Sequence, residues 1–293
     1  YAAFGNLPWV EAIFFGVKAA VLAIVIEALL RVARRALKGT LDWLIAGVAF
    51  LALYCFDVPF PLIIIAAGLV GFLRSSAADT SPATLRPSFT KLFSTSATWA
   101  AIWLMPLALL AITLGMDHVL TKIGIFFSQL AVVTFGGAYA VLSYMAQSAV
   151  ESHGWLTAPE MIDGLALAET TPGPLILVTQ FVGYLAALRG MGSVWGGLAG
   201  AAITLWMTFA PCFLWIFAGA PYIEHISRMP RLSGALAAIT AAVVGVILNL
   251  SLWFGLHVLF ARVNRGEGPF KPWLPDWQTL DIAALAITII AAF

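Results

Sequence analysis

The chain has 293 residues, of which 62% are hydrophobic and only 10% are charged. A soluble domain of this size could not cover so much apolar surface with so few charges, so the composition predicts a protein that crosses a membrane several times. The net charge of +1 indicates no nucleic-acid partner, and the spacing of the two cysteines and four histidines predicts neither a metal site nor a cofactor.

Helices that cross the hydrocarbon of a bilayer need about 20 apolar residues. By this criterion four segments each predict one spanning helix: residues 12–30, 97–116, 194–218 and 235–259. The last stretch, 281–293, is shorter than a span. The predicted fold class is all-α, a polytopic transmembrane helical bundle with broken or re-entrant helices and internal repeats.

Three other apolar segments are interrupted. Residues 43–73 are too long for one upright helix, and the prolines of "DVPFP" at 57–61 predict two short helices or one strongly kinked helix. Residues 123–145 are interrupted at "FGG", and residues 161–188 at "TPGP". A break inside the bilayer is tolerable only where protein or water satisfies the freed backbone groups, so these breaks indicate a polar interior.

The basic segment "RVARRALK", Arg31 to Lys38, follows the first predicted span and predicts a cytoplasmic loop. The polar stretch 74–91 contains two prolines and predicts an exposed linker between two halves. We therefore divide the chain into 1–73, the end of a first repeat, a linker at 74–94, and a second repeat at 95–293.

Two stretches support this internal repeat. "KAAVLAIVIEALL" at 18–30 and "TAAVVGVILNLSL" at 240–252 share four identical residues of thirteen, at an offset of 222 residues. They are followed by the similar "GTLDWLIAGVAF" and "QTLDIAALAITI". Such repeats are typical of transporters, often with inverted topology, and they predict that the chain is the middle of a longer two-repeat protein.

The break at "TTPGP" predicts a binding site for an anion. A half-helix that starts at Pro172 would point the unpaired amides of its first turn into the bilayer, with about half a positive charge from the helix dipole. The hydroxyls of Thr170 and Thr171 add donors at the same place, and Gly173 and Pro174 complete the turn. The helix is thus expected to be broken in order to form an uncharged cradle for a charged solute.

The glycine pair of "FGG" admits two interpretations. A break there would present a second set of amides to the same anion, from Phe135, Gly136 and Gly137. Equally, small residues let neighbouring helices approach closely, which is the only role we assign to Gly196, Gly197 and Gly200.

Ionisable and polar groups near the break are given separate roles. Glu169 would repel an anion, so a proton carrier is favoured over a neutral acid that caps the break. Asp163 lies about 120° away around the helix, where capping is favoured over proton coupling. Lys18 either extends to the interface or binds the anion. Gln180 and Tyr184 line the same cavity or form hydrogen bonds across helices.

Two local pairings and one solvated loop are also predicted. Glu27 is expected to pair with Arg31 one helical turn later. Thr157 and Glu160 have the spacing of a capping box, while Glu151 and its neighbour His153 are assigned to a solvated loop.

The segment Phe135 to Ala187, with its "FGG", "GWL", "TPGP" and "GY" motifs, resembles the signature region of the chromate ion transporter family. The resemblance extends over nearly the whole chain. It implies export of chromate from the bacterial cytoplasm across the inner membrane, chromate resistance, and sulfate as a similar oxyanion. Long members carry two homologous halves, each beginning with such a block, and the first block is absent here. The lipid bilayer is the other expected partner, and a homodimer is left open.

Two other classes of membrane protein are compared with a transporter. A membrane enzyme acting on a lipid phosphate could use the same helix N-terminus, but it would need a nucleophile beside a base or an arginine cluster. Arg189 is the arginine closest to "TPGP" and lies at the end of its span. A purely structural subunit would need no broken helices. A secondary transporter, not an enzyme, is therefore predicted.

Overall fold

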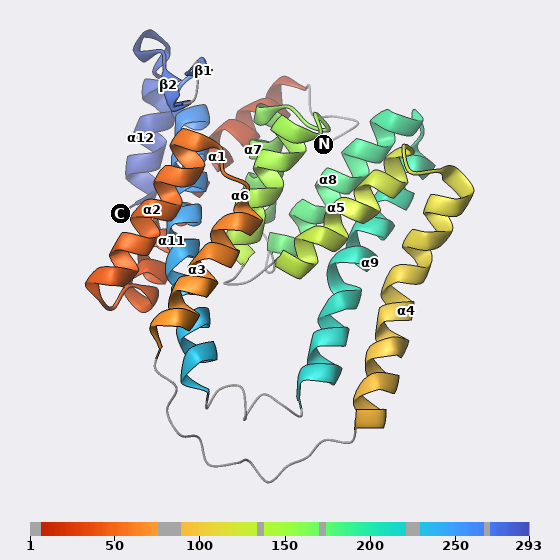
Figure 1. Ribbon diagram of the computed structural model, residues 1–293. Helices are drawn as coiled ribbons and strands as arrows, with labels where there is room; N and C mark the ends of the chain where they lie inside the picture. The colour runs from red at the N-terminus through yellow and green to blue at the C-terminus, as the bar shows by residue number, and fades with distance from the viewer. Residues whose placement is uncertain are drawn as a thin grey trace. The chain divides into compact units, whose positions relative to one another are not determined.

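The computed structural model describes residues 7–75, 89–133, 138–169, 174–220, 229–266 and 270–292. These residues are almost entirely α-helical (Figure 1), which confirms the predicted all-α class. The chain forms two compact units. The first unit comprises Tyr1–Ala67, Phe135–Val178 and Ala238–Phe293, and the second comprises Gly68–Thr134 and Thr179–Ala237.

The helices follow in the order α1 (Pro8–Ala36), α2 (Thr40–Phe56), α3 (Phe60–Arg74), α4 (Phe89–Leu114), α5 (Val119–Val133), α6 (Ala138–Gln147), α7 (Ala158–Glu169), α8 (Pro174–Met191), α9 (Val194–Gly219), α11 (Pro230–Leu259) and α12 (Ile282–Ala291). A π-helical turn, η1 (Ser148–Ser152), follows α6, and a 3-10 turn, η3 (Trp277–Thr279), precedes α12.

The four predicted spans are confirmed. Among the described residues, four helices are long and apolar enough to cross a membrane: Pro8–Ala36, Leu92–Leu114, Val194–Gly219 and Pro230–Leu259. Each contains or largely overlaps one predicted segment. The chain is therefore a multi-pass membrane protein by length and composition of its helices.

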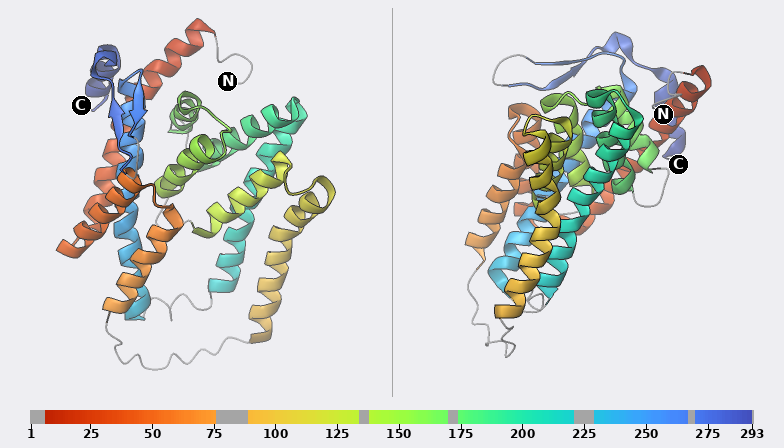
Figure 2. Two further views of the ribbon diagram at one scale, coloured as in Figure 1. Left: turned by 45° about the horizontal axis from the view of Figure 1, so that its top comes forward. Right: turned by 90° about the vertical axis from the view of Figure 1, so that its right-hand side faces the viewer.

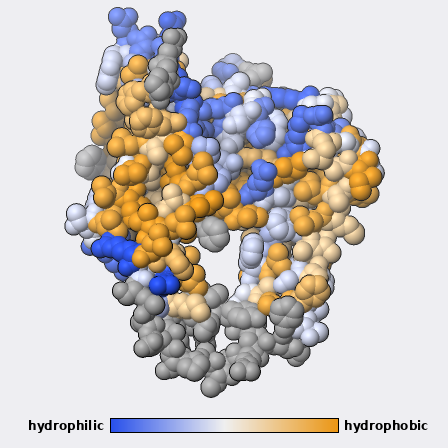
Figure 3. Space-filling model, viewed as in Figure 1, coloured by the Kyte–Doolittle hydropathy of each residue, from blue (hydrophilic) through white to orange (hydrophobic). Residues whose placement is uncertain are grey.

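The outer surface of the first unit is apolar where α2 and α3 face outward. Large hydrophobic side chains are exposed there, and Figure 3 shows a mainly orange surface over these helices. They include Trp43, Leu44 and Val48 on α2, and Leu62 and Ile65 on α3. A patch of this kind would be a liability in water and is suited to lipid tails.

The segment 43–73 forms two helices, which confirms the prediction of two short helices over that of one kinked helix. α2 ends at Phe56, and its C-cap residue Asp57 has a left-handed backbone with φ of 55°. Pro59 then removes one donor and restricts the residue before it, so the first helix cannot continue into α3.

In the first unit α1 and α11 run in opposite directions (Figures 1 and 2). Leu22 of α1 lies 3.3 Å from the position that a Cβ on Gly255 would take. Toward the other end of α1, Ala33 packs against the cluster that holds Ala241 and Val244 of α11. Residues farther along α1 therefore contact residues nearer the start of α11, as expected for antiparallel helices.

The shorter helices pack along these two. Thr288 of α12 donates its hydroxyl to the carbonyl of Ala19 in α1, at 2.9 Å. α2 approaches α11 so closely that a Cβ on Gly245 would lie 2.1 Å from the carbonyl oxygen of Ala46. Glycine is needed at this crossing because any side chain would meet backbone.

A β-hairpin was not predicted. Strands β1 (Val263–Arg265) and β2 (Trp273–Pro275) pair antiparallel, with Asn264 opposite Leu274. Three residues per strand are too few to show alternation in sequence. The hairpin is fastened near the end of α2, where the Lys271 amide donates to Cys55 O at 2.9 Å and the Tyr54 hydroxyl donates to Trp273 O at 2.9 Å.

In the second unit α8 crosses α9 through glycines. A Cβ on Gly197 would lie 2.7 Å from the ring of Tyr184, and one on Gly200 would lie 2.3 Å from the carbonyl oxygen of Gly183. A Cβ on Gly196 would similarly meet Met191 at the end of α8, at 2.7 Å. The close-packing role predicted for the three glycines of α9 is confirmed.

The packing of α4 on α9 includes a hydrogen bond that compensates for a proline. Pro106 lies inside α4, so the carbonyl of Ile102 loses its usual helical donor. The indole Nε1 of Trp206 donates to that carbonyl at 3.0 Å. An aromatic side chain of α9 thus satisfies a backbone group that lipid could not.

Replacing Trp206 by Phe is expected to cost about 0.5–1.5 kcal/mol of stability, because it leaves this carbonyl without the indole donor. Loss of helical circular dichroism during titration with sodium dodecyl sulfate measures the change. Trp215→Phe, at an exposed position of the same helix, is the control and should shift the titration less. Equal shifts for the two variants would contradict the assignment.

Candidate functional site

Most of the predicted anion cradle falls outside the described residues. This holds for Phe135, Gly136 and Gly137, and for the four residues from Thr170 to Gly173. Pro174 is described as the first residue of α8. The two predicted breaks therefore stay predictions, and the described helices α6 to α8 define their surroundings.

The helices beside these segments are short. α6 has 10 residues and α7 has 12, against about 20 for a spanning helix. They are joined by η1 and by the turn at residues 153–157, all of it described. In that turn the Glu160 half of the predicted capping box is present, since both the amide and the hydroxyl of Thr157 donate to Glu160 Oε2 at 2.9 Å.

Lys18 and Asp163 form an ion pair between α1 and α7. Lys18 Nζ lies 2.9 Å from Asp163 Oδ1, and the two side chains are 24% and 11% exposed. Asp163 lies in the middle of α7, so the expectation that it caps a helix is wrong. Lys18 turns toward α7 and pairs with Asp163, while its binding of an anion stays a prediction. No pattern in the sequence could have joined two residues so far apart in the chain.

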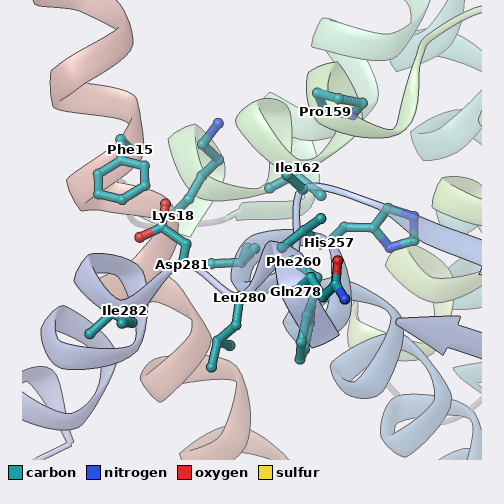
Figure 4. A pocket seen from close by; sticks show the side chains of 13 residues that line it. Phe15, Lys18, Pro159, Ile162, His257, Phe260, Gln278, Leu280, Asp281 and Ile282 are labelled. Carbon is teal, nitrogen blue, oxygen red and sulfur yellow. The ribbon is translucent and has the colours of Figure 1, made fainter. Parts of the chain in front are cut away.

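A cavity of about 520 Å³ opens beside this ion pair. Figure 4 shows Lys18 extending between Phe15 of α1 and the α7 residues Pro159 and Ile162. The opposite wall consists of the end of α11 and the segment that leads into α12, with His257, Phe260, Gln278, Thr279 and Asp281. The cavity is thus lined by polar groups as well as apolar ones.

A second, much smaller cavity lies farther along the same helices. Its volume is about 10 Å³, close to the size of one water. Val21 and Val25 of α1, Leu165 of α7 and Phe254 of α11 line it, and Glu169 is its charged lining residue. Leu142 and Leu250 complete the wall. The carboxyl group predicted to carry protons therefore meets an apolar surface.

A separate cluster of polar side chains is centred on Arg265 of the hairpin. Its guanidinium forms ion pairs with Asp57, at the end of α2, and with Glu151 of η1, the latter at 2.6 Å. It also lies over the ring of Trp273, 4.8 Å from the centroid. Gln147 Nε2 is 3.3 Å from Asp57 and 3.5 Å from Glu151. Sequence reasoning missed this cluster, because its members come from four separate segments.

Glu151 lies in η1 and pairs with Arg265, so it is not part of a loop, although the residue is exposed as expected. His153 lies in the exposed turn that follows, as expected, and stacks on Trp155 with ring centroids 4.2 Å apart. The predicted pair of Glu27 with Arg31 is confirmed at 2.5 Å and is exposed.

Gln180 and Tyr184 lie on α8 in the second unit. The ring of Tyr184 covers Gly197 of α9, and both of its predicted roles, lining the cavity or forming a hydrogen bond across helices, stay predictions. Gln180 is half-buried, and its contact with an anion stays a prediction.

These features define a class before any relative is considered. The chain is an all-α, multi-pass membrane protein that holds an ion pair, a polar cavity and a carboxyl group between helices, which is typical of solute and ion pathways. A family model described as Chromate transporter matches residues 1–72 and 121–293. The chain belongs to the chromate transporter family. The predicted resemblance is confirmed, and the family is one of transporters, not of enzymes.

Three curated relatives agree with this family. The chain is 29% identical to the Chromate transport protein of Cupriavidus metallidurans over 84% of this chain and 57% of that protein. It is 34% identical to the Chromate transport protein of Pseudomonas aeruginosa over 80% of this chain and 53% of that protein. It is 27% identical to the Probable chromate transport protein of Synechococcus elongatus over 98% of this chain and 70% of that protein.

The chain thus spans little more than half the length of two of these relatives. No solved structure matches it. The family match leaves out residues 73–120, which contain the predicted linker and α4, a helix held to α9 by the indole of Trp206.

Proposed function

We propose that the protein containing this chain exports chromate from the bacterial cytoplasm across the inner membrane, driven by an ion gradient, with sulfate as a competing oxyanion. Membership of the chromate transporter family is the observation that carries the proposal. The anion is held at two half-helix ends, the "FGG" turn and the "TPGP" turn, and Glu169 couples its movement to protons.

The lengths of α6 and α7 support the position of these ends. At 1.5 Å per residue the two helices extend for about 15 and 18 Å, roughly half of the 30 Å hydrocarbon thickness. If the turn between them lies at one interface, the far ends of both helices, Ala138 and Glu169, lie near mid-depth. That is where helix ends can act on a dehydrated anion.

The two-repeat organisation is supported by the packing of α1 and α11. Both helices begin with proline, Pro8 and Pro230, at the same offset of 222 residues that relates their sequences. That offset takes Leu22 to Val244 and Ala33 to Gly255. The contact of Leu22 with Gly255 and that of Ala33 with the cluster of Val244 are therefore equivalents of each other, as an inverted repeat requires.

The orientation of the chain in the membrane rests on charge. Four basic residues occupy the end of α1 and the loop after it, and α1 begins on the opposite side. With that basic end in the cytoplasm, the first residues of α1 face outward, toward the periplasm.

Thr171→Val in the full-length protein tests the cradle. Loss of one hydroxyl donor to a charged solute is expected to cost about 1.5–3 kcal/mol, or roughly one to two orders of magnitude in chromate affinity. The change is nearly isosteric, so folding should persist. Uptake of radiolabelled chromate into inverted membrane vesicles, with sulfate as competitor, measures the affinity.

The matched control is Thr98→Val. Thr98 is an exposed threonine of α4 whose hydroxyl bonds only within its own helix, to Ser94 O at 2.9 Å. It should leave chromate affinity unchanged. Wild-type affinity in Thr171→Val would place the anion elsewhere.

A further inference from the structure

The two cavities beside α7 lie one after the other along a single seam. On α1 the lining residues advance from Phe15 and Lys18 in the large cavity to Val21 and Val25 in the small one. These positions are three to four residues apart and share one helix face. The large and small cavities are therefore consecutive spaces along the same face of α1.

The other two helices show the same order. On α7 the lining residues advance from Pro159 and Ile162 to Leu165 and Glu169. On α11, which runs the opposite way, they advance from Val258 to Phe254 and then to Leu250, named above. Lys18 lines the large cavity, and its partner Asp163, which is a lining residue of neither cavity, falls between Ile162 and Leu165 along α7.

We propose that this seam is an access path for protons, which leads from the 520 Å³ cavity past the Lys18–Asp163 pair to Glu169. The proposal rests on the coupling role proposed for Glu169 and names the route by which its proton arrives. Asp163 accepts a proton from a hydronium ion in the large cavity, which leaves water, and later releases it to the carboxylate of Glu169. Only O–H bonds are broken and formed.

The charges at the seam select a cation over an oxyanion. The groups that face Asp163 or the cavity are Lys18 from α1, His257 from α11 and Asp281 before α12, while Glu160 and Glu169 lie on α7 itself. Lys18 is balanced by its ion pair with Asp163, and Asp281 adds a further carboxylate to the cavity wall. A dianion such as chromate would be repelled, whereas a proton would be attracted.

Distance and volume also suit a proton. Asp163 and Glu169 are six residues apart, a rise of about 9 Å along α7 and about 120° around it, so the Asp163 side chain must turn around the helix to approach Glu169. Two carboxyl side chains and one water cover such a length, and the small cavity has about 10 Å³, the room that one water requires. A dehydrated oxyanion would not fit there.

The ion pair gives the path a gate. While Asp163 is ionised, Lys18 holds it at 2.9 Å. Protonation of Asp163 removes this attraction and frees its side chain to turn toward Glu169. In the predicted orientation the large cavity opens on the periplasmic side, from which protons that drive export would enter.

The first test compares two paired neutralisations in the full-length protein. Lys18→Met with Asp163→Asn removes the gate, while Glu27→Gln with Arg31→Met removes an exposed ion pair of the same helix. Proteoliposomes containing a pH-sensitive dye report proton flux during chromate transport. The gate variant should lose at least tenfold of its chromate-coupled proton flux, with chromate affinity changed less than twofold. The Glu27–Arg31 variant should match wild type in both.

The outcomes separate this proposal from the proposed function. If wild-type protein moves no chromate, the proposed function fails. If the gate variant keeps wild-type proton flux, the path is refuted, and a tenfold loss of chromate affinity instead would make Lys18 an anion ligand. A sodium requirement in place of proton flux would also overturn it.

A second measurement does not depend on activity of the gate variant. Gln278→Cys places a thiol at the exposed rim of the large cavity, and modification rates are compared for a cationic and an anionic methanethiosulfonate of similar size. The parent protein corrects for its own cysteines. We expect the cationic reagent to react several-fold faster relative to free thiol, and an equal or reversed ratio would contradict a cation-selective cavity.

Discussion

Gly200→Leu is expected to prevent stable folding of the second unit. A Cβ at this position would lie 2.3 Å from the carbonyl oxygen of Gly183 and 2.4 Å from the Cβ of Ala187. Since one of these neighbours is backbone, no rotamer change can relieve the clash, and α8 and α9 must separate. Overpacking of this severity costs about 3 kcal/mol or more.

The comparison with Gly219→Leu isolates the crossing. Gly219 ends the same helix, and a Cβ there would meet nothing within 4 Å. Titration with sodium dodecyl sulfate, followed by circular dichroism, should show a large loss of stability for Gly200→Leu and little change for Gly219→Leu. Similar curves for the two variants would mean that α8 and α9 do not cross at these glycines.

This crossing also shows what sequence could and could not predict. The small residues of α9 indicated close helix packing, because glycine in an apolar helix has few other uses. The partner helix could not be identified, since periodicity shows which face is buried but not what covers it. Only the structure places Gly183 and Tyr184 of the "GY" motif opposite Gly200 and Gly197.

The spans and breaks were predictable for a different reason. Length and proline placement are local properties, so α1 and the break after Asp57 follow from the chain itself. Ion pairs between distant segments are not local. The pairs of Lys18 with Asp163 and of Arg265 with Asp57 were therefore missed, although each charge alone was visible in the sequence.

Arg265→Met is the second change with a large expected effect. The guanidinium is the shared partner of Asp57 and Glu151, and all three side chains are between 23% and 29% exposed. Its removal leaves two carboxylates facing each other with little solvent. Breaking a buried pair costs about 3–5 kcal/mol, and partial exposure lowers this to about 2–4 kcal/mol.

The loss should be concentrated in the hairpin, because Arg265 lies on β1 and its partners lie on other elements. The amide of Lys271, which donates to Cys55 O at 2.9 Å, reports on this docking by hydrogen exchange. We expect its protection to fall at least tenfold in Arg265→Met. Arg262→Met, at an exposed position before β1, should change it little.

Neutralising the carboxylates distinguishes charge repulsion from lost packing. In Arg265→Met combined with Asp57→Asn and Glu151→Gln, no unpaired charge is left, while the methionine still covers Trp273. If repulsion dominates, most of the protection at Lys271 should return, since a neutral substitute for a buried ion triad is often as stable as the original. If the Lys271 amide is as poorly protected in the combined variant as in Arg265→Met alone, charge repulsion is not the cause. The hydrogen bonds and the ring contact of the guanidinium then hold the hairpin in place.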